Sequence, residues 1–169
     1  LKAVGATPNA AGFNSSQDPS SFGWVRASGI NSGYAWNGYP FPGGVASGTE
    51  GAWNGLLNEL VPQIPGGLKR GSLWGYENRN NVNSPGNASF HSYGLALDIN
   101  ADANPNGAPG YGRAGQYVIP AEIAHNLAAK YGIEWGGDFR GTPDPMHFEI
   151  HLSPNDLGAP GPAAAAGSG

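Results

Sequence analysis

The chain has 169 residues, which suits one domain, and it lacks cysteine, so disulfide bonds and thiolate metal ligands are excluded. A formal net charge of -4, with no cluster of Lys and Arg beyond one adjacent pair, makes nucleic acid a poor candidate partner. Five Trp, seven Tyr and six Phe supply apolar surface for a core despite abundant Gly and Pro, and no apolar stretch approaches the roughly 18 residues of a membrane span.

Residues 1–45 are rich in Gly, Ser, Asn and Pro, and their aromatic residues follow no regular spacing. This composition predicts packed irregular coil with one short strand around Gly23–Ala27. We expect this part to belong to the same domain as residues 46–157, which hold the chemical motifs. Residues 158–169 have the Gly, Pro and Ala content that is typical of a flexible linker or tail.

The first regular element expected along the chain is an amphipathic helix over Thr49–Val61. Its apolar residues recur at the spacing of one helix face, at Trp53, Leu56, Leu57, Leu60 and Val61. The run from Ser47 to Glu50 predicts a capping box at the start of this helix. Pro62 ends it, because proline has no amide hydrogen to donate.

A second helix is expected from Ala121 to Tyr131. Pro120 suits its first turn and Gly132 suits its end. Its buried stripe is predicted to consist of Ile123, Leu127 and Tyr131.

Two segments alternate between apolar and polar residues, as strands with one face on a core do. In residues 94–100 the alternation places Asp98 on the face away from the aliphatic side chains. In residues 147–151 it places His147, Glu149 and His151 on one face. The predicted fold class is therefore α+β, with a small antiparallel sheet that carries polar groups on one face and packs helices on the other.

Metal-binding residue types gather on these strands and on the loop that enters the first of them. Two neutral imidazoles and one carboxylate form a common catalytic zinc set that leaves one position open, and His91, Asp98 and His147 fit that count. Asp144, three residues before His147, then occupies the position of a general base. By spacing alone, the other interpretation is a surface histidine and an aspartate that caps a turn or helix.

The motifs resemble a known family once they are taken together. Ser89-x-His91-x-x-Gly94-x-Ala96-x-Asp98-Ile99-Asn100 is followed by Trp135-Gly136-Gly137-Asp138 and by Asp144-x-x-His147-Phe148-Glu149. This pattern resembles the LAS metallopeptidases, the D-alanyl-D-alanine carboxypeptidase and L-alanyl-D-glutamate endopeptidase group of bacteria and phage endolysins. The resemblance implies a LAS/hedgehog-like α+β fold with the zinc site on one face of the sheet.

The resemblance also implies a role for each matching residue. His91, Asp98 and His147 would hold Zn²⁺, and Asp144 would be the catalytic base. Arg79 matches an arginine that the family places before the first histidine, where a guanidinium can stabilise an oxyanion or bind a substrate carboxylate. The alternative for Arg79 is an ion pair with Glu77 or Asp98.

The remaining polar candidates have supporting roles. Ser89 is expected to orient its loop or touch substrate, and Glu149 to orient a ligand imidazole or bind substrate. His151 is expected at the rim of the site or behind the ligands. Glu134 is the rival general base, and His125 is interpreted as a solvated helix residue. Trp135 is expected in the core or in a cleft wall that lines the peptide groove.

These inferences predict a zinc-dependent peptidoglycan peptidase that hydrolyses a bond of the stem peptide at the bacterial cell wall, either outside the cytoplasm or delivered by a phage. L-alanyl-D-glutamate endopeptidase activity of an endolysin is the first choice. The alternatives are a D-alanyl-D-alanine carboxypeptidase, a zinc amidase that cuts between sugar and peptide, and a non-catalytic zinc domain that binds the wall. We expect a monomer, with a wall-binding or virion module beyond the C-terminal linker.

Overall fold

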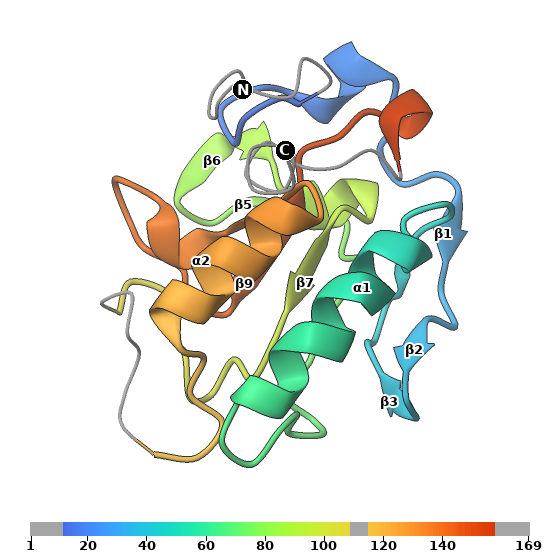
Figure 1. Cartoon of the computed structure of the whole chain (residues 1–169). Coiled ribbons are helices and arrows are strands. Elements are labelled where there is room, and N and C mark those ends of the chain that lie inside the picture. The colour runs from blue at the N-terminus through green and yellow to red at the C-terminus, as the bar shows by residue number, and fades with distance from the viewer. Residues whose placement is uncertain (1–11, 109–114, 158–169) are drawn as a thin grey trace, which may run out of the picture.

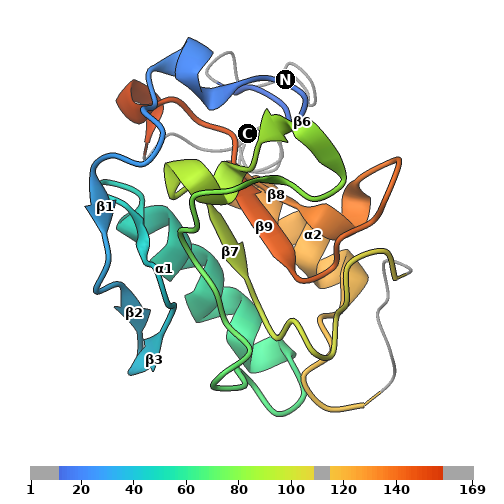
Figure 2. The same cartoon turned by 180° about the vertical axis from the view of Figure 1, so that it is seen from behind.

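The computed structural model describes residues 12–108 and 115–157, and a three-stranded antiparallel sheet lies at its centre (Figure 1). The strands run in the order β7 (Ala96–Asp98), β9 (His147–Ile150) and β8 (Ile133–Trp135). Both α-helices, α1 (Glu50–Leu60) and α2 (Ala121–Lys130), lie on one side of this sheet, and the view from behind shows the strands in front of them (Figure 2). The α+β prediction is confirmed.

Helix α1 is confirmed, but the way it begins was predicted wrongly. Trp53, Leu56, Leu57 and Leu60 are all buried, as the periodicity indicated. The capping box does not form, because the residue at the cap position is Thr49 and not Ser47, and the Thr49 hydroxyl donates to the Ala46 carbonyl at 2.6 Å instead of accepting from a helix amide. The helix is followed at once by a 3-10 turn over Val61–Gln63 that contains the expected stop residue Pro62.

Helix α2 is also confirmed, with a buried face that is shifted from the predicted stripe. Ala124 and Ala128 are the buried residues, while Ile123, Leu127 and Tyr131 are half-buried at the flanks of the core. Two small side chains face inward because α2 packs against both β8 and α1. Gly132 lies just beyond the helix with a φ of +72°, a conformation that glycine adopts without strain.

The two predicted strands form β7 and β9 and pair directly with each other. Their register places Leu97 opposite Phe148 and Asp98 opposite His147. Every residue of both strands is buried, so the polar face is covered as well as the apolar one. The sheet therefore brings two of the predicted ligands side by side in a protected environment.

The N-terminal part contains more hydrogen-bonded structure than expected, and its predicted strand at Gly23–Ala27 is wrong. Gly23 and Ala27 have φ values of +101° and +55°, which no strand accommodates. Short strands instead pair as β1 (Ile30–Asn31) with β4 (Val45–Ala46) and as β2 (Ala35–Trp36) with β3 (Tyr39–Pro40). A 3-10 turn occupies Pro19–Phe22.

Further along the chain, β5 (Asn80–Asn81) and β6 (Ser84–Ala88) form a hairpin that was not predicted. Within the described ranges, no helix is long and apolar enough to span a membrane. The predicted linker over residues 158–169 lies outside the described residues.

Candidate metal centre

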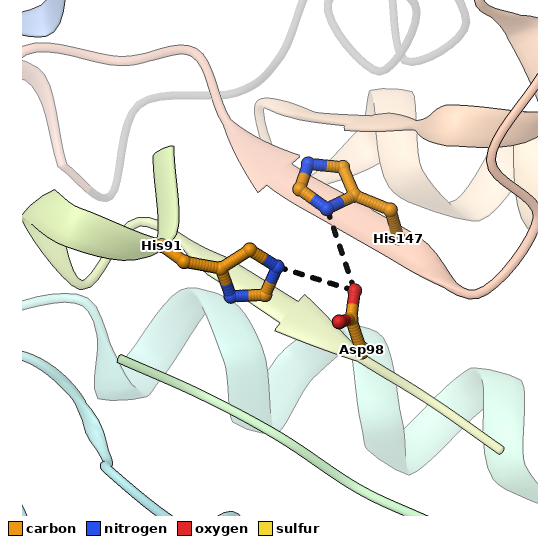
Figure 3. A group of neighbouring side chains, drawn as sticks. All are labelled: His91, Asp98 and His147. Carbon is orange, nitrogen blue, oxygen red and sulfur yellow. Dashed lines mark hydrogen bonds and ion pairs between the residues drawn. The ribbon is translucent and has the colours of Figure 1, made fainter. Parts of the chain in front are cut away.

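Three structural elements bring His91, Asp98 and His147 together. His91 lies in a 3-10 turn, η3 (Phe90–Tyr93), while Asp98 ends β7 and His147 begins β9. One carboxylate oxygen, Oδ1 of Asp98, lies 3.2 Å from Nε2 of His91 and 3.4 Å from Nδ1 of His147 (Figure 3). One potential ligand atom from each residue lies within 4.8 Å of the others.

The second nitrogen of each imidazole already has an acceptor that fixes its proton. Nδ1 of His91 donates to the Gly75 carbonyl at 2.8 Å, which leaves its Nε2 as the atom that faces Asp98. Nε2 of His147 lies 2.7 Å from Oε1 of Glu149, which leaves its Nδ1 directed at Asp98. Such partners on the far nitrogen set the tautomer and the ring orientation of metal-binding histidines.

Charge in this cluster favours a bound cation. Burial opposes ionisation of Asp98, but the imidazoles of His91 and His147 outweigh burial and hold the pKa of its carboxyl well below the usual range. Burial also opposes a charged His147, whereas hydrogen bonds to Asp98 and Glu149 raise its pKa to about 10. Burial acts against ionised Glu149, and hydrogen bonds from His147 and His151 lower its pKa to about 2.

The donor set fits Zn²⁺ on the grounds of its own chemistry. Two nitrogens and one carboxylate oxygen converge with fixed tautomers, which matches the three-ligand pattern of catalytic zinc sites. The buried carboxylate of Asp98, which lies against both imidazoles, favours a positive charge at this point. A divalent cation would supply this charge in place of a proton.

Asp144 lies beside the cluster as the sequence predicted. Its Oδ2 is 4.0 Å from Nδ1 of His147, and its buried Oδ1 has no hydrogen-bond partner among the described residues. Burial raises the pKa of the Asp144 carboxyl, with the nearby His147 opposing this effect. A carboxylate with an unused oxygen and an elevated pKa is suited to accept a proton.

A tight turn holds Asp144 in this position. Its amide donates to the Gly136 carbonyl at 2.8 Å, and its carbonyl accepts from the His147 amide at 3.0 Å. A Cβ at position 136 would lie 2.3 Å from the Asp144 carbonyl oxygen, so only glycine permits this approach. The Trp-Gly-Gly-Asp motif is thus packed directly against the Asp144–His147 turn.

A polar cleft of about 920 Å³ opens over the cluster. His91, Asp144 and His147 lie at its walls together with Glu134 and Arg79. Arg79 also forms an ion pair with Glu77 at 3.4 Å, so this predicted alternative is present, whereas the pair with Asp98 is not among the described ion pairs. The guanidinium is partly exposed, and its charge makes a small contribution that opposes the rise that burial gives to the pKa of Asp144.

Among the other predicted candidates, Ser89 and Trp135 support loops that carry site residues, and His125 lies on the surface. The Ser89 hydroxyl accepts from the His91 amide at 3.2 Å and so caps the turn that carries this histidine. Trp135 is only 2% exposed and donates to the Pro145 carbonyl at 2.7 Å, so it supports the loop before His147 from within the core rather than lining a groove. His125 is exposed as expected and contacts Asp138 at 2.6 Å.

Two segments of the cleft wall had no functional signal in the sequence. One is Asn14–Pro19, and the other is the β5–β6 hairpin, whose contribution to the cleft includes Asn81, Asn83 and Asn87. Their Asn, Ser and Gly content indicates turns and nothing more. The Gly75 carbonyl was also missed, because a backbone acceptor carries no side-chain signature.

Gly94 links η3 to β7 and is the basis of a stability prediction. Its φ is +72°, and an added Cβ would lie 2.5 Å from the Ala46 amide nitrogen. We expect Gly94→Ala to lower the free energy of unfolding by about 2 kcal/mol or more, because it combines left-handed strain with a backbone clash. Denaturant unfolding checks this result. Gly51→Ala is the control, since a Cβ there meets no described atom within 4 Å and alanine favours the helix by roughly 0.5–1 kcal/mol.

Part of the chain is similar to a known protein family. Residues 82–150 match the family model described as D-alanyl-D-alanine carboxypeptidase. The resemblance to the LAS-type zinc metallopeptidases is confirmed over this segment. Comparisons with curated proteins and with solved structures gave no match.

The matched segment includes His91, Asp98, Asp144 and His147, whereas Arg79 lies just before it. The match covers less than half of the chain, and it does not distinguish an endopeptidase from a carboxypeptidase. Zinc dependence in this family agrees with the cluster that the fold assembles.

Proposed function

We propose that this chain is a zinc-dependent peptidase that hydrolyses a peptide bond in the stem peptide of bacterial peptidoglycan. The observation that carries the proposal is the convergence of Nε2 of His91, Oδ1 of Asp98 and Nδ1 of His147 beside an unpartnered oxygen of Asp144. A purely structural zinc site has no need of a carboxylate beside the ligands. The location of all four residues within the matched segment supports the same assignment.

His91, Asp98 and His147 would hold the zinc ion, which when bound supplies a Lewis acid for the scissile carbonyl and a lowered pKa for water. Asp144 takes the proton from the attacking water and returns it to the leaving amine. Its burial and its free Oδ1 support this role. Glu134 is the weaker candidate for the general base. It lies on β8, and its carboxylate faces His151 at 3.6 Å.

Arg79 is proposed to stabilise the oxyanion or bind a substrate carboxylate. Its side chain lines the same cleft as Asp144, and its ion pair with Glu77 is largely solvent-exposed on the Glu77 side. An exposed ion pair contributes little free energy, so the guanidinium can exchange this partner for substrate at low cost.

For the bond that is cut, we propose the one between L-alanine and D-glutamate, as in endolysin peptidases. The cleft extends along walls formed by residues 14–19, by the β5–β6 hairpin and by residues 138–142, so peptide can occupy several positions around the metal centre. A D-alanyl-D-alanine carboxypeptidase is the second candidate, favoured by the description of the matched family and by Arg140 in the cleft wall, which can receive a terminal carboxylate.

The test is mass spectrometry of fragments released from purified peptidoglycan by the zinc-loaded chain, beside a sample treated with chelator. Chelator-sensitive release that exposes new N-terminal D-glutamate is the expected result. Loss of a single terminal D-alanine would instead establish the carboxypeptidase. Cleavage between sugar and peptide would indicate an amidase, and no release from several wall types would favour a non-catalytic zinc domain.

We further propose that the residues before 46 and the core over 46–157 form one peptidase domain with the LAS-type arrangement, acting as a monomer at the cell wall. Burial of Phe13, Trp24 and Tyr34 in the same core as α1 and β9 supports a single domain. A wall-binding or virion module attached beyond residue 157 would raise the local concentration of the peptidase at its substrate.

A further inference from the structure

A chain of side-chain contacts leads from the metal centre toward β8. Nε2 of His147 lies 2.7 Å from Oε1 of Glu149, whose Oε2 lies 2.6 Å from Nε2 of His151. The same nitrogen of His151 lies 3.6 Å from Oε1 of Glu134. Both oxygens of Glu149 are thus engaged by imidazoles.

Without the imidazoles, the two carboxylates of this arrangement would destabilise the sheet. Glu134 and Glu149 are direct cross-strand neighbours in the β8–β9 register, a position in which two like charges destabilise a sheet. Glu149 is also only 3% exposed, and a buried carboxylate needs hydrogen-bonding partners. His147 and His151 provide those partners on its two oxygens.

His151, the last imidazole in this series of contacts, is held in place by two phenylalanine rings and by a backbone hydrogen bond to the N-terminal segment. The ring of His151 lies 5.8 Å from the rings of both Phe13 and Phe90. The Phe13 amide also donates to the His151 carbonyl at 2.8 Å. His151 therefore has little freedom to turn away from Glu149.

We propose that Glu149 is a positioning residue for the metal centre, held in place by His151, whose imidazole also faces Glu134. Its carboxylate accepts the Nε2 proton of His147 and so keeps Nδ1 as the ligand atom beside Asp98. The inference rests on the zinc centre of the proposed function, and it assigns Glu149 and His151 to orienting a ligand instead of contacting peptide. Loss of an outer partner of a metal-binding histidine typically weakens metal affinity by about 10- to 100-fold.

The test measures zinc affinity of the full chain by competition with a chromogenic chelator. Glu149→Leu is expected to weaken zinc binding by about 10- to 100-fold, because it removes the acceptor for the Nε2 proton. Glu149→Gln should recover most of the affinity, since its amide oxygen still accepts that proton. His151→Ala should weaken binding by about 10-fold, and His125→Ala, which alters the exposed pair with Asp138, should leave it unchanged.

A spectroscopic readout separates positioning from a general loss of structure. In ¹⁵N-edited NMR spectra of the zinc-loaded protein, the wild type and Glu149→Gln should both show His147 protonated at Nε2 and bound through Nδ1. Thermal unfolding of the metal-free variants identifies any that fail to fold. If Glu149→Leu fails to fold, the zinc affinities of Glu149→Gln and His151→Ala still test the positioning role of Glu149.

Equal zinc affinity in wild type and Glu149→Leu would overturn the inference. So would two zinc ions per chain with one lost in His151→Ala, because Glu134, Glu149 and His151 would then form an ion site of their own. The order of zinc affinities among the wild type and the variants does not depend on whether the protein hydrolyses peptidoglycan. A chain that shows the ranking but releases no wall fragments supports the inference and refutes the proposed function.

Discussion

Asp144→Asn should abolish hydrolysis of the wall peptide while leaving zinc bound. The amide keeps the size of the carboxyl, and the Asp144 side chain makes no hydrogen bond through Oδ1 that the substitution would break. Loss of a general base typically costs about 10²- to 10⁴-fold in turnover. The measurements are kcat on purified peptidoglycan or a stem-peptide substrate, and the zinc content of the purified variant.

The rival base provides the matched comparison for this prediction. Glu134→Gln removes a second carboxylate of the same cleft, whose pKa burial also raises. We expect it to reduce kcat by no more than about 10-fold, since Glu134 acts at most through His151 and Glu149. If Glu134→Gln abolished hydrolysis and Asp144→Asn reduced kcat by no more than about 10-fold, Glu134 would be the base. Equal loss of zinc in Asp144→Asn and His147→Ala would contradict the separation of base from ligand.

The elements that the sequence predicts well are those whose pattern is local. Helix α1 follows from the spacing of Trp53 and its leucines, and β7 and β9 follow from strict alternation. The ligand candidates were found for a related reason. The alternation places Asp98 and His147 on the polar face, and the register then sets them directly opposite each other.

The features that the sequence does not predict depend on contacts between distant parts of the chain. Phe13 lies beside His151 through a backbone hydrogen bond that no periodicity encodes. The Gly75 carbonyl can orient His91 because the Gly75 amide donates to the Pro42 carbonyl and the next amide, of Tyr76, donates to the Gly44 carbonyl. The predicted strand at Gly23–Ala27 failed for the opposite reason, since turn geometry at its two ends overrides strand propensity.

Zinc should stabilise the fold, and variants of the ligands should lose this stabilisation. An ion that binds the folded chain alone adds about 2.7 kcal/mol to the free energy of unfolding at a free concentration 100 times its Kd. For a domain of this size that corresponds to a rise in Tm of roughly 5–10 °C. Differential scanning calorimetry with and without zinc measures the shift.

Asp98→Asn and His147→Ala should show almost none of this rise, because each removes one of the three converging ligand atoms. His125→Ala is the control, since its imidazole lies on α2, outside the ligand cluster, and it should show the full rise. A full zinc-dependent shift in Asp98→Asn would place the stabilising ion elsewhere. Because the cluster holds a buried carboxylate between two imidazoles, the metal-free Asp98→Asn protein also loses their ionic partner, so each variant must be compared with its own metal-free form.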